Sequence, residues 1–114
     1  MPIHHEDIDE RLRRIRFTGR LDIPGTQAVA EAFAQLASDR ARRVVVDLRQ
    51  VEFLASVGLR EIISVAKDLR QLGGKMVLCV DANSFVAKTL DVTGIDTLIP
   101  THHSLDEADR AALS

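Results

Sequence analysis

The spacing of apolar residues divides the chain into alternating strands and helices, beginning with a hairpin. Apolar and basic residues alternate over residues 12–17 (LRRIRF), which is the period-two pattern of a half-buried strand. The polar stretch 9–11 before it predicts a turn from an antiparallel partner strand over residues 3–8. We therefore expect the chain to open with two antiparallel strands.

Two nearly continuous apolar runs predict buried strands. Residues 44–48 (VVVDL) are rich in β-branched side chains, and residues 76–80 (MVLCV) repeat the pattern further along the chain. A strand without polar alternation is covered on both faces, as in the interior of a parallel sheet. The short pair Leu98-Ile99 before Pro100 predicts a last strand, which brings the expected number to about five.

Helices are predicted between these strands. The best-defined one covers residues 57–72, where apolar residues recur at helical spacing up to Gly73-Gly74, and glycine readily adopts the left-handed conformation that ends a helix. Ser56 stands at the expected N-cap of this helix. The remaining helices are expected over residues 26–38, after a breaker-rich loop at 21–25, over 84–91, and from Ser104, whose Glu107 completes a capping-box pattern.

Strands that alternate with helices at this spacing need right-handed crossovers, which build an α/β fold. We expect a single domain over residues 1–114 with a mixed, mostly parallel sheet of about five strands and about four helices. Ligands and partners of such sheets gather at the carboxyl ends of the strands. The segments 21–25, 47–56 and 81–84 are therefore expected to carry the functional residues.

The composition excludes several classes of function. The 114 residues contain 15 basic and 17 acidic side chains, four Phe, and neither Trp nor Tyr, so there is no basic aromatic surface for nucleic acid. No apolar stretch approaches the ~20 residues that span a bilayer, and the N-terminal residues are too polar for a signal peptide. The single Cys79 lies in an apolar run and suits a reducing compartment. We expect a cytoplasmic protein without membrane contact, monomeric when free.

Metal and cofactor sites are not predicted. The histidines form two adjacent pairs, His4-His5 and His102-His103, and neighbours on a strand point to opposite faces. No glycine-rich phosphate loop precedes a helix. One alternative is a small nucleotide-binding protein that uses the carboxylates of Asp22 and Asp47, which both stand near strand ends. Apart from this alternative, we expect no cofactor and no enzymatic activity.

Ser56 is the most informative hydroxyl of the chain. It stands where the loop 53–55 runs into the strongest helix. A serine there caps the helix, but a phosphate on it would also meet free N–H groups and the positive end of the helix dipole. Arg60 follows four residues on, on the same helical face, where its guanidinium could pair with such a phosphate.

Taken together, several segments resemble a STAS domain in their order and spacing. The resemblance covers about residues 13–113, nearly the whole chain, and is closest to stand-alone anti-sigma factor antagonists. Its segments are Gly19-Arg20-Leu21-Asp22, residues 44–48, residues 51–59 (VEFLASVGL), residues 72–78 (LGGKMVL), Thr93-Gly94-Ile95 and residues 104–108 (SLDEA).

The resemblance implies a binding protein regulated by phosphorylation. Such a domain binds an anti-sigma factor with a serine-kinase fold and thereby releases a sigma factor. Phosphorylation of the serine that Ser56 matches ends this binding, and a metal-dependent serine phosphatase restores it. We expect the partner surface at the residues that flank this serine: Asp22, Ile23, Leu54, Val57 and Arg60.

The loop around Ser56 departs from the family pattern in two positions. The family commonly has Asp-Ser-Ser/Thr-Gly, whereas this chain has Ala55-Ser56-Val57-Gly58, without the acidic residue and the second hydroxyl. This departure keeps a second interpretation open, in which the chain is a STAS scaffold or accessory subunit of a signalling or transport complex and Ser56 is never phosphorylated.

Overall fold

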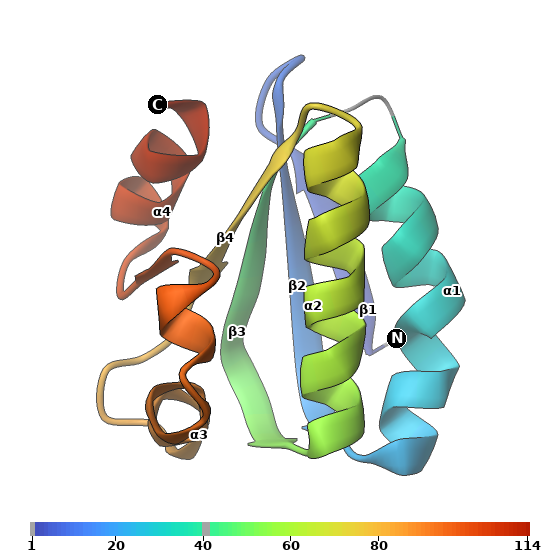
Figure 1. Cartoon of the computed structure of the whole chain (residues 1–114), viewed down its shortest axis with the longest axis vertical. Coiled ribbons are helices and arrows are strands. Elements are labelled where there is room, and N and C mark those ends of the chain that lie inside the picture. Colours follow the sequence, from blue (N-terminus) through green and yellow to red (C-terminus); the bar gives the residue numbers. More distant parts are fainter. Residues whose placement is uncertain (1, 40–41) are drawn as a thin grey trace.

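One five-stranded sheet organises the protein (Figure 1). The structure is a computed structural model that describes residues 2–39 and 42–114. The strands lie side by side in chain order, β1 antiparallel to β2 and all later neighbours parallel. The elements are β1 (Ile3–Asp7), β2 (Leu12–Leu21), α1 (Ile23–Ser38), β3 (Arg43–Leu54), α2 (Ser56–Gln71), β4 (Lys75–Cys79), α3 (Phe85–Thr93), the 3-10 turn η1 (Ile95–Thr97), β5 (Thr101–His102) and α4 (Leu105–Leu113).

The predicted α/β class is confirmed, with a mixed sheet and four α-helices. Figure 1 shows α1 and α2 side by side against one face of the sheet, and α4 on the other side. The main core lies under α1 and α2, where the rings of Phe17 and Phe33 meet edge to face with centroids 5.0 Å apart. A smaller core lies under α4 and contains Leu12, Val45, Val77, Cys79, Ala108 and Ala112.

The start of α1 differs from the sequence prediction. The helix begins at Ile23, so most of the expected loop 21–25 belongs to its first turn. Asp22 is the N-cap and its carboxylate accepts a hydrogen bond from the Gly25 N–H (2.9 Å). Pro24 does not break the helix because proline lacks only an N–H that has no acceptor in the first turn. Gly25 is required there, since a Cβ would come within 1.9 Å of the Arg20 carbonyl oxygen.

Two strand predictions also need correction. The pair Leu98-Ile99 is not a strand, because the N–H groups of both residues bond back to the Ile95 carbonyl and continue the turn of η1. The last strand is β5, just beyond Pro100. The strand predicted over residues 44–48 continues further than expected, because β3 stays paired with β2 as far as Leu54. The other predicted strands and helices agree with the structure within a few residues.

A buried ion cluster fastens β1 to the rest of the fold. Arg13 and Arg42 are each 5% exposed, and both donate to the Asp7 carboxylate, at 2.6 Å from Arg13 Nε and 3.1 Å from Arg42 Nη1. Arg13 also donates to the Leu36 carbonyl of α1 (2.9 Å). The hydrogen bond from Arg13 holds the pKa of Asp7 below its ordinary value of 3.8, against the opposing effect of burial. Asp7 therefore connects β1, β2 and the segment before β3.

We predict that Asp7→Asn lowers the free energy of unfolding at neutral pH by about 1–2 kcal/mol. The loss is no larger because Asp7 is half-exposed and solvent screens its charge, although Arg13 and Arg42 are buried. Because folding depresses the pKa of Asp7, its contribution to stability is complete at a pH above the unfolded-state pKa. The contribution is lost as the pH falls through the folded-state pKa. Urea unfolding of both proteins at pH 7 and near pH 3 measures the difference, which should shrink in acid. The control Glu10→Gln alters an exposed residue of the neighbouring turn and should change little. A difference in unfolding free energy that stays the same at both pH values would contradict the assignment of Asp7 as the charged partner of Arg13 and Arg42.

Candidate functional site

The carboxyl ends of β2 and β3 bring two of the three predicted functional segments together, whereas the third, 81–84, follows β4. The two strands end in register, with Leu21 opposite Leu54, and the Ala55 N–H donates to the Leu21 carbonyl (3.0 Å). Helix α1 starts two residues after Leu21, and α2 starts two residues after Leu54. Both helices therefore begin at the same edge of the sheet, which we call the switch edge and define as residues 20–25 and 53–60.

Ser56 lies at this edge with a free hydroxyl. The prediction that Ser56 is the N-cap is wrong, because Ala55 is the N-cap and Ser56 is the first helical residue. Its side chain is exposed and makes no hydrogen bond within residues 2–39 and 42–114. The first helical hydrogen bond runs from the Leu59 N–H to the Ala55 carbonyl (3.0 Å), so the N–H groups before Leu59 have no acceptor in the helix. Ser56 thus borders an uncapped, electropositive helix end.

Close packing fixes the position of this helix end. A Cβ on Gly58 would lie 2.9 Å from Leu54 Cδ1 and 3.0 Å from the Leu21 carbonyl oxygen. Only glycine lets the first turn of α2 lie this close to the ends of both strands. The hydroxyl of Ser56 is therefore carried by a helical turn that is packed closely against the ends of both strands, and not by a loop.

The other predicted partner residues differ in their accessibility. Ile23 is 62% exposed, Val57 is half-buried and Arg60 is exposed, so all three present atoms to solvent at the switch edge. Leu54 is only 3% exposed and belongs to the main core, where it supports the edge from below. Asp22 caps α1, and the hydrogen bond from the Gly25 N–H lowers the pKa of its carboxyl.

The sequence analysis missed an aromatic extension of the edge. Arg20 and Phe53 are paired in the β2–β3 register, and the Arg20 guanidinium lies 4.6 Å from the centroid of the Phe53 ring. The Phe53 ring is in turn 6.4 Å from that of Phe85, which is 62% exposed at the start of α3. The sequence does not reveal this cluster, because its residues lie far apart along the chain. Only the register of β2 with β3 and the packing of α3 bring them together.

The alternative nucleotide site is not formed. Arg16 pairs with Asp47, and Asp22 lies six residues beyond Arg16, or about 20 Å along the strand direction. Asp47 is instead buried and bonded to Arg49 (2.9 and 3.1 Å). The expectation that the two carboxylates could meet was wrong because residues 47–54 continue as strand.

Cys79 lies inside the sheet, fully buried, and burial raises the pKa of its thiol to about 11. The thiol is therefore neutral and unreactive at neutral pH. Within the part of the chain that the structure describes, no group of three His, Cys, Asp or Glu side chains is arranged to hold a metal ion. Nor does any described helix combine the length and apolarity needed to cross a membrane.

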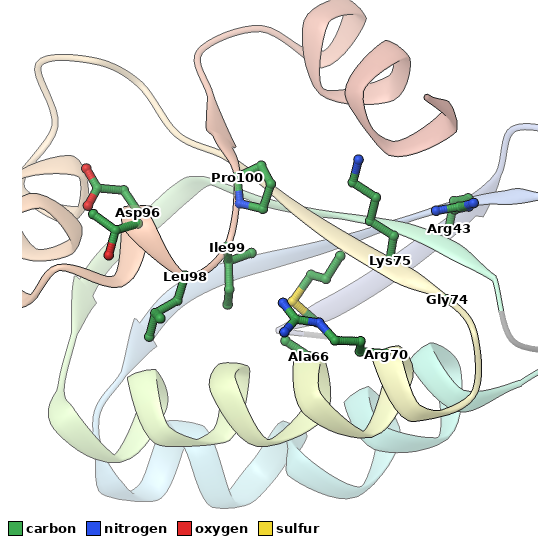
Figure 2. Close-up of a pocket in the computed structure, with 11 residues that line it drawn as sticks. Arg43, Ala66, Arg70, Gly74, Lys75, Asp96, Leu98, Ile99 and Pro100 are labelled. Carbon is green, nitrogen blue, oxygen red and sulfur yellow. The ribbon is translucent and has the colours of Figure 1, made fainter.

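A hollow of about 420 Å³ lies away from the switch edge, between the C-terminal part of α2 and the segment that follows α3 (Figure 2). Arg43, Arg70 and Lys75 line it, but they do not converge on one point. Figure 2 shows Lys75 pointing toward α4, where its Nζ donates to the Ala111 carbonyl (2.8 Å), whereas Arg70 extends from α2. The hollow contains none of the predicted functional residues.

Comparison with known proteins points to one family. The profile of the STAS domain family matches residues 5–108. A Bordetella bronchiseptica protein assigned as an anti-sigma factor antagonist, BtrV, is 36% identical over 85 residues, which are 75% of this chain and 72% of that protein.

Solved structures agree with this match. An anti-sigma factor antagonist from Mycobacterium paratuberculosis is 25% identical and superposes with a TM-score of 0.85, covering 98% of this chain and 93% of the other. The antagonist SpoIIAA shares the fold in its unphosphorylated form (16% identity, TM-score 0.75) and in its phosphorylated form (15%, 0.69), with 96% of this chain covered in each case and 95% and 98% of those chains. The profile match over most of the chain, together with these relatives, shows that the protein belongs to the STAS domain family.

Proposed function

We propose that the protein is an anti-sigma factor antagonist whose switch edge binds an anti-sigma factor, and that phosphorylation of Ser56 ends this binding. One observation carries the proposal: Ser56 is exposed and unbonded beside the uncapped N-terminus of α2. The resemblance to the family matches this residue to the regulated serine. The anti-sigma factor antagonists among its relatives support the role. The resemblance to the family implies that this partner has a serine-kinase fold.

Before Ser56 is phosphorylated, the switch edge has the surface properties of a protein-binding site. Ile23 and Val57 present apolar surface, and Asp22, Arg20 and Arg60 surround it with charges of both signs. Exposed apolar side chains with a polar rim are typical of protein interfaces. Leu54 contributes by supporting this surface from the core.

A phosphate on Ser56 has opposite consequences in the free and the bound protein. It carries about −1.5 to −2 charges at pH 7, and in the free protein the first-turn N–H groups, Arg60 and water can stabilise it. At an interface the same group loses water, and an unpaired buried charge typically costs several kcal/mol, where each ~1.4 kcal/mol changes affinity tenfold. Phosphorylation can therefore end binding without any change of fold.

The remaining chemistry belongs to other proteins. A serine phosphatase acting on the phosphoprotein would restore binding, and the chain itself is proposed to be a cytoplasmic, non-enzymatic monomer between encounters.

A second function, that of a non-phosphorylated STAS scaffold or accessory subunit, is favoured by the residues that flank Ser56. Ala55 and Val57 replace the acidic residue and the second hydroxyl common in the family, so the local recognition signal for a kinase is reduced. Capture of partners followed by mass spectrometry separates the two: a small kinase-fold protein supports the switch, and a multi-subunit assembly with unmodified Ser56 supports the scaffold.

We predict that a kinase-fold partner binds the unmodified protein and, with Mg-ATP, transfers phosphate to Ser56. The phosphoprotein and Ser56→Asp should bind at least 100-fold more weakly, which corresponds to about 2.7 kcal/mol. Ser56→Ala should bind normally and accept no phosphate. Phosphopeptide mass spectrometry and calorimetric titration measure these quantities.

Ser64 provides the matched control. It is an exposed serine of the same helix, about 12 Å further along its axis. Ser64→Asp should bind the partner as tightly as the unmodified chain. Phosphate on Ser64 or Ser84, or full-strength binding by Ser56→Asp, would reject the switch and favour the scaffold.

We also predict that Ile23→Asp weakens partner binding at least tenfold, because it places a carboxylate on the apolar part of the switch edge. Val92→Asp is the control, since Val92 is 83% exposed on α3, outside the defined edge. Circular dichroism should show both variants folded. Equal effects of the two substitutions would mean that the partner does not use this edge.

A further inference from the structure

The sheet face opposite α1 and α2 is only partly covered. Helix α4 packs over one part of it, on Leu12, Val45 and Cys79. Beside this helix, β1, β2 and β3 form the floor and one wall of a groove of about 470 Å³, and Leu105 of α4 contributes to its lining. The polar residues of the groove are His4, His5, Glu6, Arg14, Arg16, Asp47 and Arg49. This groove is separate from the switch edge.

The strand register collects three guanidinium groups in this groove. His4, Arg16 and Asp47 form one row across β1, β2 and β3. Arg14 lies two residues before Arg16 on β2, and Arg49 lies two residues after Asp47 on β3, so all of them face the same side of the sheet. Strands lie ~4.8 Å apart and alternate residues ~6.7 Å apart, which places Arg16 in the middle, about 7–8 Å from each of the other two arginines.

Two of these arginines already have carboxylate partners. Arg14 donates to Asp109 of α4 (3.2 Å from Nε) and lies 3.5 Å from Glu6. Arg49 grips the Asp47 carboxylate with Nε and Nη2, and Asp47 is only 4% exposed. These pairs neutralise the two arginines on either side of Arg16 and hold their guanidinium groups in fixed positions.

Arg16 is different. It makes no ion pair within the described residues, and its Nε is buried without a hydrogen-bond partner. A buried donor without an acceptor is rare in native proteins because it loses its water without replacing it. The neighbouring Asp47 carboxylate bonds to Arg49 instead. The groove therefore holds one guanidinium that no carboxylate pairs with, and its Nη atoms, which are not buried, are the donors that an external acceptor can reach.

We propose that this groove binds a small phosphate monoester, with Arg16 as the principal ligand and His4 and the free Nη1 of Arg49 beside it. A phosphate has more terminal oxygens than a carboxylate and matches several donors that converge from different strands. The groove is larger than the anion, and Leu105 offers an apolar surface for the organic part of the molecule. The site does not rest on the proposed function, because it lies on the other face of the sheet.

The test is a titration of the isotope-labelled full chain with inorganic phosphate and with phenyl phosphate, followed by nuclear magnetic resonance against chloride of equal ionic strength. We expect saturable shifts at residues 4–6, 14–16 and 47–49, and tighter binding of phenyl phosphate. Arg16→Gln should bind at least tenfold more weakly. Arg11→Gln removes the same charge from an exposed position outside the groove and should bind as the unmodified chain does.

Several outcomes would overturn the site. Shifts confined to residues 55–59 would place the phosphate at the N-terminus of α2 instead. Undiminished binding by Arg16→Gln, or an equal loss in Arg11→Gln, would show general charge attraction only. Should Arg16→Gln fail to fold, Arg16→Lys keeps the charge and lacks the guanidinium donors, and wild-type affinity in that variant would contradict the role of the Arg16 guanidinium.

Discussion

The parallel pairing of β2 with β3 is the interaction on which the functional edge depends. The two strands run side by side from Leu12 and Arg43 to Leu21 and Leu54 and end together. Since each strand is followed at once by a helix, the common end of the ladder places the first turns of α1 and α2 next to each other. A shift of the register by one residue would turn every side chain of the shifted strand to the other face and move the starts of α1 and α2 out of line.

In the proposed function, this arrangement lets the protein act as a switch through binding alone. Gly58 allows the first turn of α2 to pack on Leu21 and Leu54, which holds the Ser56 hydroxyl in place while the helix end remains uncapped. The free N–H groups tolerate a negative charge in solution, whereas a partner seated on the same edge would bury it. The effect of phosphorylation then depends on the environment of the phosphate, and the fold can stay the same.

The sequence predicts the fold well where periodicity reports burial directly. The buried strands around Val45 and Val77 and the long helix α2 follow from apolar spacing, and the start of α4 after Ser104 follows from its capping-box pattern. Leu98-Ile99 was misread because two apolar residues satisfy a strand and a buried turn equally well. The start of α1 was missed because Pro24 and Gly25 commonly mark loops, although the Asp22 cap makes them suitable for a first helical turn.

The candidate site was predictable in its centre and not in its surroundings. Ser56 and Ile23 follow from the expected strand ends, but the Arg20–Phe53–Phe85 cluster and the groove around Arg16 depend on cross-strand register, which the sequence does not display. The most direct test of the switch edge is hydrogen–deuterium exchange of the chain with and without its captured anti-sigma partner. The account predicts protection of residues 20–25 and 53–60 that disappears after phosphorylation of Ser56. Protection confined to α4 or to the groove on the opposite face would contradict it.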